Sequence, residues 1–251
     1  MPRRNLFILG AAILGLGVLA AAAWAGSSLR LACNDFPPHK IETPAADGLR
    51  GFDIDIIDEA LHRTGWSAEF SFLPWKRALE FAVRGEVDGL CSCSRTPERE
   101  ATLLFSNELG AVSVGLFARD PAALAGIAKV GDLKGRKVAV VGGYNLEGEL
   151  NDAGATVLAA SSDKNALDML LGGNIDLLYG YELTTRHFMR AEKPATAVEY
   201  LEMHRNPYYF CLSRQLPKAE QAMADFNSGL AAMTKDGSIA RILGRYDVMF
   251  R

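Results

Sequence analysis

The residue best suited to ligand chemistry is Arg99, because a guanidinium can hold a carboxylate through two parallel hydrogen bonds. Thr96 and Pro97 precede it and are typical of a helix N-cap and first helical position. Arg99 is therefore expected in the first turn of a short helix. The alternative is a surface arginine that pairs with Glu98 or Glu100.

Two hydroxyl side chains, Ser92 and Ser94, lie just past a predicted strand and close to Arg99 in sequence. Hydroxyl and backbone N–H groups at such a place can bind the polar atoms of a ligand. Cys91 and Cys93 alternate with the serines, so in an extended chain they would point to the other face. That orientation favours packing or disulfide bonding for the cysteines over ligand binding.

A second candidate segment is Gly142-Gly143-Tyr144-Asn145, which ends a predicted strand and begins a predicted helix. A helix N-terminus offers unpaired N–H groups and a dipole that favours an anion, and Asn145 is a good N-cap. The alternative is an ordinary capped turn. Phe36 and Trp75 each follow a predicted strand and could form aromatic walls of a site, or could pack inside a lobe.

The elements that must position these residues alternate between strand and helix. Apolar patterns predict a first unit with strands at 29–33, 69–73 and 87–91 and helices at 52–64 and 74–84. A second unit has strands at 137–141, 156–158 and 175–179 and helices at 145–152 and 162–171. Strands separated by helices of this length are typical of parallel α/β sheets.

Two extended stretches, 111–119 and 208–214, are suited to connect these units, and two helices at 217–234 and 238–246 follow them. Two lobes joined by two crossings imply a hinge and a cleft. Ligands of α/β sheets bind outside the carboxyl ends of the strands. The pattern therefore predicts enclosure of a small solute by hinge closure.

Composition excludes several other classes of function. The 251 residues include 27 basic and 30 acidic side chains, a net charge of −3, so no strong positive field favours nucleic acid. Four scattered histidines and four cysteines lack the spacing of a metal site, and no phosphate loop or nucleophile elbow occurs. We expect a binding protein without a cofactor or metal and without catalytic activity.

The N-terminus has the three-part pattern of a secretory signal peptide. Arg3 and Arg4 precede an uncharged apolar run over residues 6–25, which ends in the small-x-small tripeptide Ala23-Trp24-Ala25. We therefore expect residues 1–25 to direct export to the periplasm. An uncleaved membrane anchor is the alternative, because the run is just long enough to cross a bilayer.

Six short segments occur along nearly the whole mature chain, in the order Gly51-Phe52-Asp53-Ile54-Asp55, 85–89, 94–99, 104–106, 133–138 and 236–238. In these segments the chain resembles the family 3 periplasmic solute-binding proteins, the polar amino-acid receptors of ABC importers. The resemblance implies a two-lobed, type II α/β fold, each lobe a mainly parallel sheet flanked by helices, with two hinge crossings. Lobe 1 would comprise residues 29–110 and 207–251, and lobe 2 residues 111–206. It also implies a monomer that delivers a small, carboxylate-bearing solute to a membrane ABC permease.

The resemblance also implies a ligand-binding role for particular residues. Arg99 would grip the carboxylate of the ligand, and Ser92, Ser94, Phe36, Trp75, Tyr144, Asn145 and Tyr181 would line the cleft.

The sequence departs from the family pattern at Tyr181, where amino-acid receptors usually carry an aspartate for the α-amino group. An ammonium left without its partner is costly to bury. Either Glu182 or Asp35 substitutes for the missing acid, or the ligand is not an ordinary α-amino acid.

In the implied fold Cys33, Cys91 or Cys93, and Cys211 lie on neighbouring strands, and we expect at most one disulfide.

Two other functions remain open. One is a stand-alone periplasmic sensor or accessory binding protein. The other is an enzyme that resembles the cyclohexadienyl dehydratases, for which Glu182 or His39 would be the acid or base.

Overall fold

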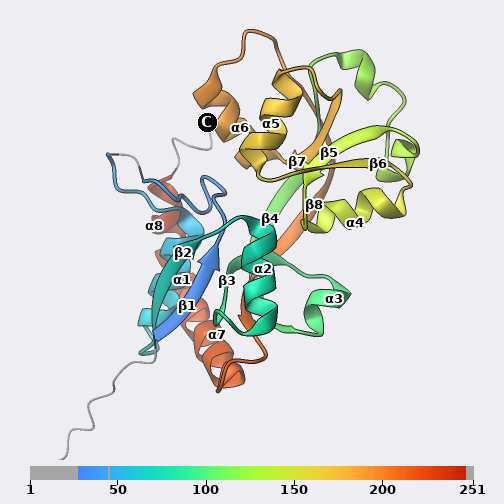
Figure 1. Ribbon diagram of the computed structural model, residues 1–251. Coiled ribbons are helices and arrows are strands. Elements are labelled where there is room, and N and C mark those ends of the chain that lie inside the picture. The colour runs from blue at the N-terminus through green and yellow to red at the C-terminus, as the bar shows by residue number, and fades with distance from the viewer. Residues whose placement is uncertain (1–27, 45, 247–251) are drawn as a thin grey trace, which may run out of the picture.

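The computed structural model describes residues 28–44 and 46–246 (Figure 1). The predicted signal peptide, residues 1–25, lies outside the described residues. Within residues 28–44 and 46–246, no helix combines the length and the apolar character needed to cross a membrane.

Eight strands form one continuous sheet in the order β2-β1-β3-β8-β4-β7-β5-β6. The pairs β1·β2, β1·β3, β5·β6 and β5·β7 are parallel, and the pairs that involve β4 or β8 are antiparallel. The strands are β1 (Ser28–Cys33), β2 (Ser67–Phe72), β3 (Gly89–Ser94), β4 (Leu103–Ala118), β5 (Lys137–Val141), β6 (Thr156–Ala160), β7 (Leu177–Tyr181) and β8 (Glu199–Ser213).

Helices pack against both the β1–β3 part and the β5–β7 part of this sheet. They are α1 (Phe52–His62), α2 (Trp75–Arg84), α3 (Pro97–Glu100), α4 (Asn145–Asp152), α5 (Asp163–Leu171), α6 (Glu182–Glu192), α7 (Ala219–Lys235) and α8 (Ser238–Gly244). Two 3₁₀ turns, Pro121–Leu124 and Val130–Leu133, lead from β4 to β5. Most expected elements are present within a few residues of their predicted bounds. The exceptions are β4 and β8, which are longer than predicted, and α6, which was not among the predicted helices.

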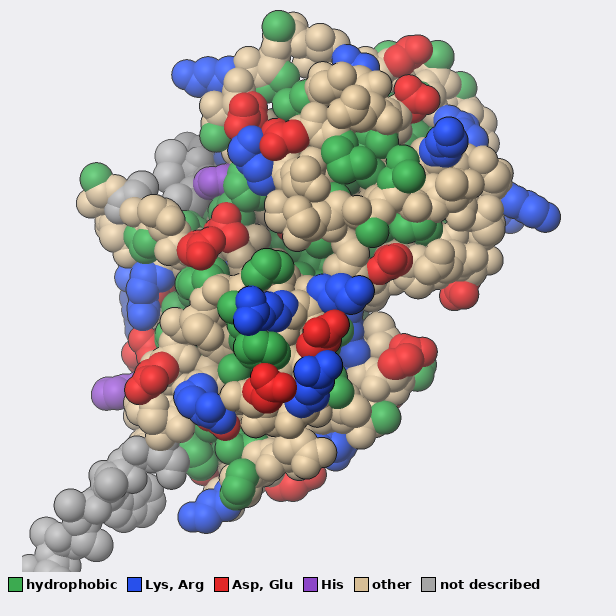
Figure 2. Space-filling view, in the orientation of Figure 1, with side chains coloured by type: hydrophobic (Ala, Val, Ile, Leu, Met, Phe, Trp, Pro, Cys, Tyr) green, Lys and Arg blue, Asp and Glu red, His purple; other side chains and the backbone are tan. Residues whose placement is uncertain are grey.

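The fold is a two-lobed, mixed α/β structure (Figure 1). The first lobe holds β1–β3 with α1, α2, α3, α7 and α8, and the second holds β5–β7 with α4, α5 and α6. Figure 2 shows the same division as a notch between two bodies, with basic and acidic side chains interspersed over the visible face.

The long strands β4 and β8 run through both lobes as an antiparallel ribbon, with pairs from Leu103↔Ser213 to Ala118↔Glu199. Both are much longer than the predicted crossings, and the expected lobe boundaries at 110/111 and 206/207 fall inside them. The pairing shifts register near Phe105, Glu108 and Val114. Such bulges bend and twist a strand locally, which suits a hinge.

The loop after β1 folds back onto the start of α1, and a glycine makes this possible. Gly51 has a φ of 105°, which favours glycine, and a Cβ there would collide with the backbone of His39 and Lys40. The N–H of Asp53 donates to the His39 carbonyl oxygen at 2.9 Å. The loop is thereby fixed with His39 and Lys40 beside the first turn of α1.

All four cysteines form disulfides, so the expectation of at most one bond is wrong. Cys33 of β1 bonds to Cys91 of β3, and Cys93 of β3 bonds to Cys211 of β8, with Cα–Cα distances of 5.2 and 6.3 Å. The reason is a register shift in the β3–β8 pairing between Leu90 and Cys93. Past this shift Cys93 packs in a different apolar cluster from Cys91, so each has its own partner.

We predict that both bonds are present in the purified protein. Thiol titration in denaturant should detect no free thiol before reduction and four after it. Because the bonds close loops of 58 and 118 residues, the double variants Cys33→Ala/Cys91→Ala and Cys93→Ala/Cys211→Ala should each lose about 2–5 kcal/mol of unfolding free energy in urea titrations. Two or four thiols before reduction would contradict this pairing.

Candidate functional site

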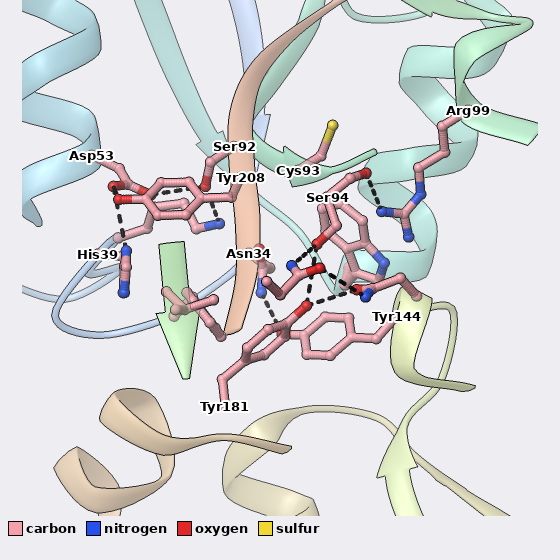
Figure 3. A pocket seen from close by; sticks show the side chains of 16 residues that line it. Asn34, His39, Asp53, Ser92, Cys93, Ser94, Arg99, Tyr144, Tyr181 and Tyr208 are labelled. Atoms are coloured by element: carbon pink, nitrogen blue, oxygen red, sulfur yellow. Dashed lines mark hydrogen bonds and ion pairs between the residues drawn. The ribbon is translucent and has the colours of Figure 1, made fainter. Parts of the chain in front are cut away.

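All eight predicted site residues line one cavity between the lobes (Figure 3). The cavity volume is about 40 Å³, which is room for a few water molecules and less than a typical ligand site. The lobes are therefore closed on each other. Eight further residues line the cavity: Asn34, His39, Lys40, Asp53, Cys93, Val112, Asn206 and Tyr208. Of these, His39 was predicted from the sequence only as a possible acid or base, and the expectation that Cys93 points away from the ligand side is wrong.

Arg99 lies at the start of α3, where the Thr96 hydroxyl accepts a hydrogen bond from its N–H, as the sequence predicts for an N-cap. The side chain is only 6% exposed. Its Nη1 donates to the Ser94 carbonyl oxygen at 2.8 Å, and Nη2 donates to the Gly143 carbonyl oxygen at 3.0 Å. Burial lowers the pKa of Arg99, but a guanidinium stays charged in proteins.

No carboxylate of the described residues forms an ion pair with Arg99. The alternative of a surface pair with Glu98 or Glu100 is wrong, since Arg99 is buried and Glu100 instead lies 3.5 Å from Arg95. The guanidinium lies over the ring of Trp75, 5.1 Å from its centre. The site thus contains a buried positive charge that the protein does not neutralise by contact.

The Gly143 carbonyl oxygen is a point of contact between the lobes. It accepts hydrogen bonds from Arg99 and, at 2.7 Å, from Trp75 Nε1, both in the first lobe. Gly143 has a φ of 81°, a conformation that favours glycine.

The start of α4 departs from the prediction, because Asn145 is its first residue and not its N-cap. Tyr144 takes the N-cap place and makes no side-chain cap. Glu147 accepts the Gly143 N–H at 2.6 Å, so an acidic side chain already lies at this helix start.

Asn145 and Tyr181 of the second lobe instead join a polar network with Ser94 of the first (Figure 3). Tyr181 donates to Asn145 Oδ1 at 2.7 Å, and its hydroxyl lies 3.2 Å from Ser94 Oγ. Asn206 of β8 also donates to Ser94 Oγ, at 2.7 Å. These bonds fix the phenol of Tyr181 in the cavity wall.

An aromatic wall crosses the interface between the lobes. The ring centre of Phe36 lies 5.3 Å from that of Tyr181 and 6.3 Å from that of Tyr144. Trp75 lies 5.8 Å from Tyr144, and these three pairs meet close to edge-to-face. Such contacts stabilise the closed arrangement beyond the apolar area that they bury.

A buried polar cluster closes the other end of the cavity. Asp53 of α1 accepts from Ser92 at 2.8 Å and from Tyr208 at 3.1 Å, and His39 Nδ1 lies 3.3 Å from it. Lys40 Nζ donates to Ser92 Oγ at 2.9 Å. His39 Nε2 is buried without a hydrogen-bond partner among the described residues. No periodic pattern of the sequence signals this cluster, because it depends on the loop that folds back through Gly51.

Neither acid that could have replaced the missing aspartate reaches the cavity. Glu182 pairs with Arg186 at 2.8 Å, and Asp35 accepts the Glu42 N–H at 3.0 Å. Asp163 is buried nearby but lies behind Tyr144, whose hydroxyl donates to it at 2.7 Å. Among residues 28–44 and 46–246, no group of His, Cys, Asp or Glu is arranged to hold a metal ion.

A cavity between two α/β lobes that are joined by two long strands defines a type II binding protein. The match to a family model is consistent with this class: residues 30–248 match the bacterial extracellular solute-binding proteins, family 3, and the chain belongs to this family. No match was found among curated protein sequences.

Solved structures share the fold at low sequence identity. A histidine kinase sensor domain with similarity to periplasmic binding proteins has a TM-score of 0.77 and 21% identity, over 88% of this chain and 96% of that one. An ancestral arginine-binding protein bound to arginine has a TM-score of 0.75 and 23% identity, over 90% and 99%. An amino acid ABC transporter substrate-binding protein from Streptococcus pneumoniae, bound to L-arginine, has a TM-score of 0.73 and 18% identity, over 89% and 95%.

A second network supports Asn145 from behind. Glu149 accepts from Asn145 at 3.2 Å and from Tyr179 at 2.6 Å, and lies 2.9 Å from His204 Nε2 of β8. The hydrogen bond to Glu149 raises the pKa of His204 against the effect of burial. Burial opposes ionisation of Glu149, but its hydrogen bonds from His204 and Tyr179 lower its pKa overall.

The two shifts define a pH window for this stabilisation. The raised pKa of His204 gives stability that is lost as pH rises through that pKa, and the lowered pKa of Glu149 gives stability that is lost as pH falls through it. We predict that His204→Gln lowers the melting temperature most near about pH 6 and less near about pH 9. His62→Gln, at an exposed position of α1, is the control. An equal loss of melting temperature at both pH values would contradict the proposed pairing of His204 with Glu149.

Proposed function

We propose that this solute-binding protein captures a small carboxylate-bearing solute in the cavity between its lobes. The observation that carries the proposal is the Arg99 guanidinium, which is buried, lines the cavity and has no carboxylate partner in the described residues. A buried charge without a counterion is unfavourable, so an anion in the cavity would stabilise the closed form. The planar fork of Arg99 is matched to a carboxylate.

Closure follows from the distribution of these contacts. Ser94 and Arg99 belong to the first lobe, and Tyr144, Asn145 and Tyr181 belong to the second. A ligand that bonds to both sets has more contacts in the closed form than in the open form, and this difference shifts the population. Its carboxylate would take the place on Arg99 that the Gly143 carbonyl oxygen holds in this structure. The register shifts in β4 and β8 are the proposed hinge.

The remaining features of the proposal concern the role of the whole protein. Residues 1–25 direct export, the protein acts in the periplasm as a monomer, and it delivers its ligand to an ABC permease. The segments 29–110 and 207–251 form the first lobe and 111–206 the second. Support comes from the family and from the similarity to a substrate-binding protein of an ABC transporter.

A periplasmic sensor is the second candidate, because a histidine kinase sensor domain shares the fold over 88% of this chain. Uptake of labelled ligand by cells that lack the gene separates the two roles. Loss of uptake supports delivery to a permease, and intact uptake with loss of a transcriptional response supports a sensor. Of the two residues considered for an enzymatic role, Glu182 is bonded to Arg186 outside the cavity, whereas His39 lies in the cavity lining, 3.3 Å from Asp53. We do not propose an enzymatic role.

We predict that ligand binding depends on Arg99. A thermal-shift panel of L-amino acids, monocarboxylates and dicarboxylates selects the compound with the largest shift, and calorimetry measures its affinity. Arg99→Ala should weaken binding by at least roughly a hundredfold, because it leaves the carboxylate buried without a partner. Arg99→Lys should weaken it by roughly tenfold, because the charge stays and the fork is lost.

Arg95→Ala is the matched control, since Arg95 lies at the same strand end but is exposed and outside the cavity. Its affinity should stay within about twofold of the unaltered protein. A near-normal affinity of a folded Arg99→Ala protein, or a panel without any shift, would overturn the proposed function.

A further inference from the structure

A second buried cation, Lys40, lines the same cavity as Arg99. Its side chain is 4% exposed, and its ammonium lies 4.9 Å from the centre of the Phe36 ring. Among the described residues its Nζ makes one hydrogen bond, to Ser92 Oγ at 2.9 Å. An ammonium carries three N–H donors, so Lys40 has donors left for a ligand.

The nearest carboxylate does not bind Lys40 directly. Both oxygens of Asp53 are already bonded, Oδ2 to Ser92 and Oδ1 to Tyr208 and His39. The Ser92 hydroxyl therefore stands between the two charges. Burial lowers the pKa of Lys40 to about 8 against the attraction of Asp53, Asp163 and Asp35, which leaves the side chain charged at neutral pH.

The two cations hydrogen-bond to β3 at residues that are two apart in the strand. Lys40 bonds to Ser92, and Arg99 bonds to the carbonyl oxygen of Ser94, two residues further on. Two residues of a strand span roughly 7 Å. In Figure 3, Ser92 and Arg99 lie on opposite sides of Cys93. The spacing of the two points on β3 to which Lys40 and Arg99 bond suits the two ends of a short, flexible dianion.

The described lining residues offer no free carboxylate to a ligand ammonium. Tyr181 stands where the family resemblance leads us to expect an acid, and Asp53, the one carboxylate among the described lining residues, already accepts three hydrogen bonds. The aromatic faces of Phe36 and Trp75, which could attract a cation, lie under Lys40 and Arg99. A ligand cation would meet two like charges at close range.

We infer, on the basis of the proposed function, that the ligand is a short dicarboxylate without an amine, held by Arg99 at one end and by Lys40 at the other. Lys40 is then the residue that selects a dianion over a monoanion. Tyr181 in turn disfavours an α-amino acid with the same carbon skeleton.

The test is calorimetry with glutarate, succinate, butyrate and L-glutamate. Glutarate or succinate should bind the unaltered protein at least roughly tenfold more tightly than butyrate and L-glutamate. Lys40→Met should weaken dicarboxylate binding by at least roughly tenfold and change butyrate binding by less than about twofold. Lys235→Met, at an exposed position of α7 in the same lobe, should change neither.

The melting temperature of each variant shows whether it is folded, and Lys40→Gln, which keeps a donor without the charge, replaces Lys40→Met if that variant does not fold. The ranking of the four compounds on the unaltered protein needs no variant. The inference would be overturned if L-glutamate bound more tightly than both glutarate and succinate, or if loss of Lys40 left the dicarboxylate affinity unchanged. In either case the proposed function would still stand, provided that binding depends on Arg99. Absence of Arg99-dependent binding of any carboxylate, amino acids included, would overturn both.

Discussion

The guanidinium of Arg99, buried where the two lobes meet, is the constraint on which the rest of the site depends. It needs acceptors from both lobes, and it has one from each, the carbonyl oxygens of Ser94 and Gly143. Backbone carbonyl groups carry only partial charge, so the positive charge still lacks a counterion among the described residues. The closed lobes therefore form a cavity that favours an anion.

Local features of the sequence place this charge. The Thr96 cap fixes the start of α3 and turns Arg99 back towards β3, while the left-handed conformation of Gly143 directs its carbonyl group to the first lobe. Trp75 contacts both, as a hydrogen-bond donor to Gly143 and as an aromatic face under Arg99. Thr96, Gly143 and Trp75 thus each help to hold the buried guanidinium of Arg99.

The disulfides separate a rigid part of the molecule from a part that can bend. They join β1 to β3 and β3 to β8 inside the first lobe, so the strand that carries Ser92 and Ser94 is held on both sides. From Pro207 back to Glu199, towards the second lobe, β8 pairs with β4 alone. The register of this pairing shifts between Val114 and Gly115. Opening of the lobes would then leave intact the part of the site that belongs to the first lobe, including Ser92 and Ser94.

Much of this organisation could be predicted because it depends on local pattern. The apolar runs predict the strands. The segment from Thr96 to Arg99 contains its own N-cap and first-turn proline, so the position of Arg99 could be predicted from the sequence. The polar helix α6 was missed because its apolar positions are few. Lys40 and Asp53 were missed because their meeting depends on a loop that folds back through Gly51, a contact that no periodicity announces. The pairing of the cysteines depends equally on a register shift that only the sheet reveals.

The most direct measurement is a crystal structure of the protein with the carboxylate that raises its melting temperature most. The account predicts a closed molecule in which a carboxylate of the ligand accepts two hydrogen bonds from Arg99 and also contacts the second lobe at Tyr144, Asn145 or Tyr181. A ligand bound outside this cavity, or one inside it whose carboxylate does not contact Arg99, would contradict the account.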